Sequence, residues 1–172
     1  MKKRKYYKRK RRIPFIFKSL FFTLLLGIGN ELIRPLFAEN KTGGVRIVDG
    51  DNLVLNERRI RILGLDTPEL KQSCYALSGQ SWPCGEHAKQ FLVTLTKNSP
   101  VECKLYNKDK YGRDLGTCFI EDKDIAQILI RSGYGIATGT TYMISEVAAR
   151  KDKLGIWSGT FQTPKQWRDS KR

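Results

Sequence analysis

Acidic side chains in two short segments of the chain have the types and spacing that could bind a metal ion. Asp49 and Asp51 flank Gly50, and Asp66 follows a run of residues typical of a strand. Carboxylate oxygens at strand ends suit a hard cation, calcium above all. A D-G-D triplet alone is more often a simple turn, so the neighbouring residues must decide between the two interpretations.

Two arginines and a glutamate accompany these carboxylates. Arg61 precedes Asp66 by five residues, and Glu69 follows it by three. Arg113 lies in the glycine-containing segment D-K-Y-G-R. Hydrolysis of a phosphodiester needs an activated water, a metal that organises charge and fixed cationic donors for the phosphate oxygens. Arginine suits the last task because its planar guanidinium donates two hydrogen bonds and stays charged.

The elements that must position these residues are predicted to form a small barrel. Five β-rich runs occur at 45–48, 53–55, 59–65, 101–105 and 115–120. Helices are predicted after Cys84 and Gly85, from Ile125 to about Gly133, and from about Tyr142. The apolar side expected for the last helix consists of Ile144, Val147 and Ala148. This order predicts an α+β fold: a five-stranded OB-fold β-barrel with about three α-helices.

Four cysteines follow the N-terminal region, and an even number suggests disulfides in an oxidising compartment. Cys103 and Cys118 lie symmetrically about the turn near Lys110, which places them opposite each other in a hairpin. Three pairings are formally open, and the one that closes two local loops also joins Cys74 to Cys84. A zinc site is disfavoured because the chain contains no C-x-x-C motif.

The first 38 residues are typical of an export signal, with a basic stretch to Arg12, an apolar stretch at 13–28 and a small residue at Ala38. They hold 11 of the 32 Lys and Arg residues, so the net charge of +15 falls to +5 for residues 39–172. We expect a cleaved signal, with an uncleaved membrane anchor as the alternative. Residues 39–172 would then form one exported domain, periplasmic or extracellular.

The three segments together resemble the signature of the staphylococcal nuclease (thermonuclease) family, D-G-D-T, R-x-x-x-x-D-[TA]-P-E and D-[KR]-Y-G-R. The present chain has D-G-D-N from Asp49, R-I-L-G-L-D-T-P-E from Arg61 and D-K-Y-G-R from Asp109. The resemblance extends over about 43–159. The loop between the first two cysteines and the tail after Gly155 resemble an exported bacterial branch of the family.

This resemblance implies a metal site and a set of catalytic and substrate-binding residues. The implied calcium ligands are Asp51, Asp66 and the Thr67 carbonyl. The implied catalytic residues are Glu69, as general base or water orienter, and the transition-state-stabilising Arg61 and Arg113. The implied substrate contacts are Lys110, Tyr111 and Tyr142, the last as a base-stacking residue. Asp49 is expected to support the site rather than to bind the ion.

Two residues qualify this picture. Asn52 stands where the family usually has Thr, and the only histidine, His87, is expected to be structural or solvated rather than catalytic. The resulting hypothesis is a calcium-dependent nuclease acting on DNA, RNA or both, a monomer with no obligate protein partner. The alternatives are a non-catalytic OB-fold binding module, which the retained arginines and acids argue against, and a membrane-tethered protein.

Overall fold

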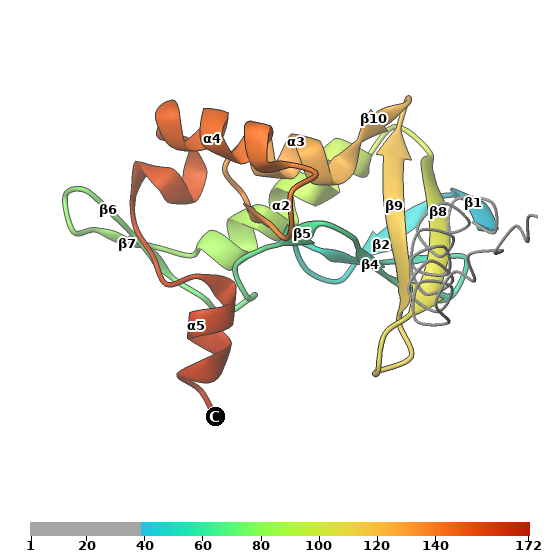
Figure 1. Cartoon of the computed structure of the whole chain (residues 1–172), viewed down its shortest axis with the longest axis horizontal. Helices are drawn as coiled ribbons and strands as arrows, with labels where there is room; N and C mark the ends of the chain where they lie inside the picture. Colours follow the sequence, from blue (N-terminus) through green and yellow to red (C-terminus); the bar gives the residue numbers. More distant parts are fainter. Residues whose placement is uncertain (1–38) are drawn as a thin grey trace, which may run out of the picture. The chain divides into compact units, whose positions relative to one another are not determined.

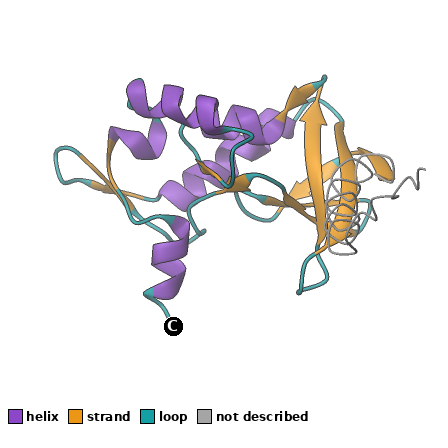
Figure 2. Cartoon of the chain, in the orientation of Figure 1, coloured by secondary structure: helices purple, strands orange, loops and turns teal. Residues whose placement is uncertain are grey.

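The structure is a computed structural model, and it describes residues 39–172 (Figure 1). The predicted export signal or anchor at 1–38 lies outside the described residues. Within residues 39–172, no helix combines the length and the apolar character that crossing a bilayer requires. The described part carries one main β-sheet with helices packed beside it (Figure 2).

The main sheet contains the five predicted strands and two that were not predicted. The predicted strands are β2 (Val45–Ile47), β3 (Asn52–Leu55), β4 (Arg58–Ile62), β8 (Val101–Lys108) and β9 (Asp114–Ile120). The additional strands are β1 (Glu39–Gly43) and β10 (Lys123–Asp124). The strand order is β1-β8-β9-β4-β3-β2, with β10 beside β9, and β4 and β9 pair in parallel.

The sheet curls until its two ends approach each other, which confirms the predicted barrel. β1 pairs with β8 at one end of the order and also contacts β3, near the other end. Asn56, in the turn after β3, donates a hydrogen bond to the Thr42 carbonyl. Arg58 of β4 forms an ion pair with Glu39 of β1. The core between sheet and helices includes Leu53, Ile60 and Leu129, which are fully buried.

The predicted strand at 59–65 is interrupted, so that Arg61 and Asp66 lie on different elements. Gly64 has φ of 76°, a left-handed conformation that ends β4, and β5 (Leu65–Asp66) then pairs with β11 (Ile136–Ala137). The prediction of one continuous strand was therefore wrong. The break turns the Asp66 segment away from the barrel strand without moving it far from Arg61.

The three predicted helices are present, and a short fourth helix follows them. They are α2 (Cys84–Thr96), α3 (Ile125–Arg131), α4 (Met143–Lys151) and α5 (Pro164–Asp169). α2 buries Ala88 and Leu92. A 3-10 helix, η2 (Gly155–Ser158), and β12 (Gly159–Thr160) connect α4 to α5. In Figure 1, α3 and α4 lie above β5 and α5 lies below it.

The predicted inner side of α4 was wrong. Ile144 and Val147 are exposed, whereas Ser145 and Ala149 are buried. α4 packs against α3, so the side that fits closely carries small residues and the larger apolar side chains point outward. The large apolar residues at helical spacing, from which the inner side was predicted, therefore lie on the exposed side of α4.

Both disulfides form as predicted. Cys103 and Cys118 are directly paired across β8 and β9, with Cα atoms 4.1 Å apart. Cys74 and Cys84 join the loop after the acidic segment to the start of α2. That loop contains β6 (Cys74–Ala76) and β7 (Ser81–Trp82), which form a small sheet with β12.

Candidate active site

Arg61 holds the two carboxylates that the sequence assigned to a metal. Its Nη1 donates to Asp51 Oδ1 at 3.1 Å, and its Nη2 lies 3.0 Å from Asp51 Oδ2 and 3.2 Å from Asp66 Oδ1. Asp51 comes from the turn before β3, and Asp66 from β5. Their side chains are 6% and 9% exposed, so two buried acids flank one nitrogen atom of Arg61.

Asp51 is costly to ionise in this environment. Burial raises its pKa to about 7, and the nearby Asp49 and Asp66 act in the same direction, although Arg61 and a backbone hydrogen bond from Thr67 oppose the rise. A cation beside Asp51 would offset this cost, because it favours the charged form of the carboxyl.

Asn52 connects the acidic turn to the second predicted arginine. Its Nδ2 donates to Asp49 Oδ1 at 2.9 Å and also to Asp51 Oδ1, while its Oδ1 accepts from Arg113 Nη1 at 2.9 Å. Asp49 also accepts from the Asp51 N–H. Asp49 therefore stiffens the turn, as expected for a supporting residue.

Arg113 is fixed from its other side by Asp109. Arg113 Nε donates to Asp109 Oδ2 at 2.7 Å, and the Arg113 and Tyr111 N–H groups donate to Asp109 Oδ1. Burial raises the pKa of Asp109, but these hydrogen bonds outweigh it and lower the pKa below its ordinary value. The D-K-Y-G-R turn is thus built around one carboxylate that directs Arg113 toward Asn52.

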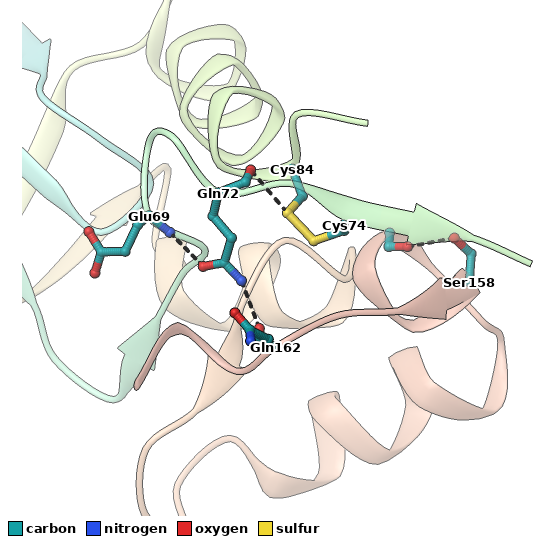
Figure 3. The surroundings of a disulfide bond; sticks show 7 residues. Glu69, Gln72, Cys74, Cys84, Ser158 and Gln162 are labelled. Atoms are coloured by element: carbon teal, nitrogen blue, oxygen red, sulfur yellow. Dashed lines mark hydrogen bonds between the residues drawn. A yellow bond between two sulfur atoms is a disulfide. The ribbon is translucent and has the colours of Figure 1, made fainter. Parts of the chain in front are cut away.

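Glu69 is placed by the backbone that surrounds it. Its N–H donates to Oε1 of the fully buried Gln72 at 3.1 Å, and Gln72 Nε2 donates to the Gln162 carbonyl at 2.7 Å. Figure 3 shows the Gln72 side chain between these two partners, with the Glu69 carboxylate pointing away from it. A Cβ at Gly85 of α2 would lie 1.8 Å from the Glu69 carbonyl oxygen, so only glycine allows this close approach.

A third arginine, which the sequence interpretation missed, reaches the same carboxylates. Arg168 of α5 donates through Nη1 to Asp66 Oδ1 at 3.1 Å and to Glu69 Oε1 at 2.7 Å. Its Nη2 donates to Asp66 Oδ2 at 3.1 Å. Thr163 and Gln166 form a capping box with Pro164 in the first turn, a pattern that could have predicted α5. No local pattern links Arg168 to acids about a hundred residues earlier.

The three arginines, Asp49, Asp51, Asn52 and Glu69 line a pocket of about 400 Å³, whereas Asp66 is not on its wall. The acids on its wall are Asp49, Asp51 and Glu69, and the bases are Arg61, Arg113, Arg168 and Arg172. Thr67 and Tyr111 also line it, and Tyr111 is 70% exposed at the hairpin tip. Lys110 is exposed beside it, with its Nζ 5.0 Å from the centre of the Tyr111 ring.

Tyr142 does not join this group. Its hydroxyl donates to Asp124 Oδ2 at 2.7 Å, and its ring lies against Gly64 and packs on the barrel core. Burial and the hydrogen bond to Asp124 raise the pKa of Tyr142. His87 is exposed and contacts the Trp82 ring, away from the pocket.

The donor set fits a hard cation that keeps water ligands. Asp51 and Asp66 share one neighbour in Arg61, and Thr67, which directly follows Asp66, is buried and lines the pocket. Among residues 39–172, no three His, Cys, Asp or Glu side chains are already arranged as a metal cluster. Calcium and magnesium tolerate such a site because carbonyl and water oxygens complete their coordination.

Comparison with known proteins gives consistent matches. A family model described as staphylococcal nuclease homologue matches residues 59–159. The chain is 32% identical to the micrococcal nuclease of Shigella flexneri over 155 residues, which cover 78% of this chain and 83% of that protein. It is 28% identical to an endonuclease of Escherichia coli O157:H7 over 138 residues, covering 74% and 84% respectively.

A further match is to a protein named for a different process. The chain is 32% identical to the succinoglycan biosynthesis protein ExoI of Rhizobium meliloti (strain 1021) over 126 residues. This match covers 70% of the present chain and 66% of that protein, so the chain spans just under two thirds of it.

Proposed function

The chain belongs to the staphylococcal nuclease family, and from this premise we propose that it is a nuclease that hydrolyses phosphodiester bonds in DNA, RNA or both, with calcium as its cofactor. The observation that carries the proposal is the position of Arg61, which lines the pocket together with Asp51, Glu69 and Arg113 and also contacts the buried Asp66.

Calcium would be held by Asp51, Asp66 and the Thr67 carbonyl. A bound divalent cation supplies positive charge for the phosphate oxygens and makes a nearby water more acidic. The two carboxylates support this assignment, because carboxylate and carbonyl oxygens are the ligands that calcium prefers. Magnesium shares the oxygen preference, so the two ions must be compared directly.

Glu69 would accept the proton of the attacking water. Its carboxylate lines the pocket and is 34% exposed, so it is accessible to water, while Gln72 fixes its backbone. General-base assistance contributes roughly 10²-fold or more to such rates.

Arg61 and Arg113 would stabilise the negative charge that develops on the phosphate oxygens. They lie on the pocket wall, and each is fixed by a neighbouring acid, Asp51 and Asp109 respectively. Fixed donors of this kind cost little reorganisation when charge develops. Tyr111 and Lys110, at the tip of the β8–β9 hairpin, would contact a phosphate further along the substrate.

An exported location fits the same function and is part of the proposal. Two buried disulfides are typical of proteins that fold in an oxidising compartment, so we place the enzyme outside the cytoplasm. Cleavage of residues 1–38, their use as a tether and a monomeric state stay predictions.

A calcium titration of nucleotide release tests this function. The purified protein should release acid-soluble nucleotides from DNA or RNA only when calcium is present. The rates on matched DNA and RNA substrates would show which of the two is the better substrate. Glu69→Gln and Arg61→Lys should each lose roughly 10²-fold in turnover and keep the fold. Equal activity in all three proteins, or binding without cleavage, would instead favour a non-catalytic module.

A further inference from the structure

Arg168 brings a positive charge from the C-terminal helix onto two carboxylates of the site. It contacts both oxygens of Asp66 and one oxygen of Glu69. The Asp66 side chain is 9% exposed, and Arg61 already contacts its Oδ1. Both Asp66 oxygens are therefore engaged by guanidinium groups.

Arg168 lies on a helix that is fixed at its start and joined to the Glu69 loop. Thr163 and Gln166 cap the start of α5 reciprocally, and Pro164 occupies its first turn. The chain that leads into α5 is joined to the Glu69 loop by the hydrogen bond from Gln72 to the Gln162 carbonyl (Figure 3). One buried amide thus positions both Glu69 and the segment that delivers Arg168.

A divalent cation at Asp51 and Asp66 would have to share Asp66 with this arginine. Two positive charges on one carboxylate repel each other, and the repulsion is stronger where the carboxylate is removed from water. Arg168 is 37% exposed, so it can turn outward into solvent.

We propose that Arg168 is a displaceable counter-ion of the cation site, which competes with the divalent cation for Asp66 and Glu69 and so lets α5 set the affinity for the cation. This inference rests on the proposed function, because that function assigns the cation to Asp66. Coupling of this kind is reciprocal: if docked Arg168 weakens cation binding by some factor, the bound cation weakens the docking of Arg168 by the same factor.

Calcium binding by calorimetry, without any substrate, tests the proposal. Arg168→Gln removes the charge and should bind calcium on the order of tenfold more tightly than the wild type, within the usual range of coupling between sites. Arg168→Lys keeps the charge and should stay much closer to the wild type. Lys165→Gln is the matched control, since Lys165 lies on the same helix, is 77% exposed and pairs with Asp169.

Amide hydrogen exchange gives a second measurement that does not depend on affinity. Saturating calcium should speed exchange in residues 164–169 of the wild type, and the same ion should have little effect there in Arg168→Gln. Circular dichroism and the unfolding midpoint show whether Arg168→Gln is folded. If it is not, Arg168→Lys is compared with the wild type instead.

The outcomes separate this inference from the proposed function. Calcium binding that is unchanged or weaker in folded Arg168→Gln overturns the counter-ion role and leaves the nuclease assignment intact. A wild type that binds no calcium and cleaves nothing overturns both. A wild type that binds calcium, with tighter binding in Arg168→Gln and calcium-dependent exchange in α5, supports the inference.

Discussion

Arg113 Nη1 donates a 2.9 Å hydrogen bond to Asn52 Oδ1, which joins the β8–β9 hairpin to the acidic turn 61 residues earlier. Asn52 stands where the family signature has Thr. Its side-chain amide also acts as a donor, since Nδ2 donates to Asp49 and Asp51. This one side chain therefore sets the distance between a proposed cation ligand and a proposed transition-state donor.

Asn52→Ala should impair catalysis more than substrate binding. Loss of the amide frees Arg113 on its pocket side and removes one donor from each of Asp49 and Asp51, so turnover should fall roughly tenfold or more. Stability should fall by about 1–2 kcal/mol, because Asn52 is only 8% exposed. Measurement of kcat and KM checks this, with the exposed Asn107→Ala of the same hairpin as control. A change confined to KM would contradict it.

Gly85→Ala should disturb Glu69 through the backbone alone. The new methyl would lie 1.8 Å from the Glu69 carbonyl oxygen, so either α2 or the Glu69 loop must move. Overpacking of this kind costs about 1–3 kcal/mol, and turnover should drop with it. Urea unfolding and nuclease activity are the measurements. Gly44→Ala, where nothing lies within 4 Å of the added carbon, should change neither.

The pair between Arg58 and Asp114 should make stability depend on acid pH. Arg58 Nε and Nη2 donate to the two Asp114 oxygens at 2.8 and 2.9 Å, and these hydrogen bonds lower the pKa of Asp114 below 3.8. Since the folded pKa is the lower one, the contribution is complete above about pH 4 and is lost as the pH falls through the folded pKa.

Asp114→Asn should therefore be less stable than the wild type by about 1–3 kcal/mol at pH 7, and the difference should shrink below pH 4. Urea unfolding of both proteins across pH 2.5 to 7 measures it. Asp122→Asn, an exposed turn residue, serves as control. A difference that does not vary with pH would exclude the charge as its cause.

Removal of the Cys103–Cys118 disulfide should destabilise the barrel. The bond closes a loop of 15 residues, for which the loss is about 3 kcal/mol. The double variant Cys103→Ala, Cys118→Ala should unfold at a lower urea concentration. Added reductant should lower the wild-type midpoint by more than that of the double variant, which retains only the bond between Cys74 and Cys84. Equal shifts would mean that the hairpin bond contributes little.

The sequence was informative where a short motif carried both the turn and the chemistry. Asp51, Arg61 and Glu69 lie within 19 residues, and the elements between them are short, so their convergence followed from strand and turn signals. The hairpin bond was predictable because antiparallel pairing places Cys103 opposite Cys118.

Contacts between segments that are distant in the sequence could not be predicted from local motifs. Arg168 reaches Asp66 from 102 residues away, and nothing in its neighbours indicates that partner. The exposed side of α4 was misassigned because Ser145 and Ala149 pack closely where larger apolar residues would not fit. Tyr142 was chosen for its aromatic ring, but its hydroxyl is bound to Asp124.

β1 would limit where a peptidase could cut the chain if the predicted signal is removed. It pairs along β8 from Glu39 to Gly43, and β8 has β9 on its other side. A peptidase that cuts before Glu39 leaves β1 whole. A cut within 39–43 would strip β8 of a partner and expose a row of unpaired backbone N–H and C=O groups, along which copies of a chain can join and aggregate. The site of processing would thus decide whether the released protein stays dispersed.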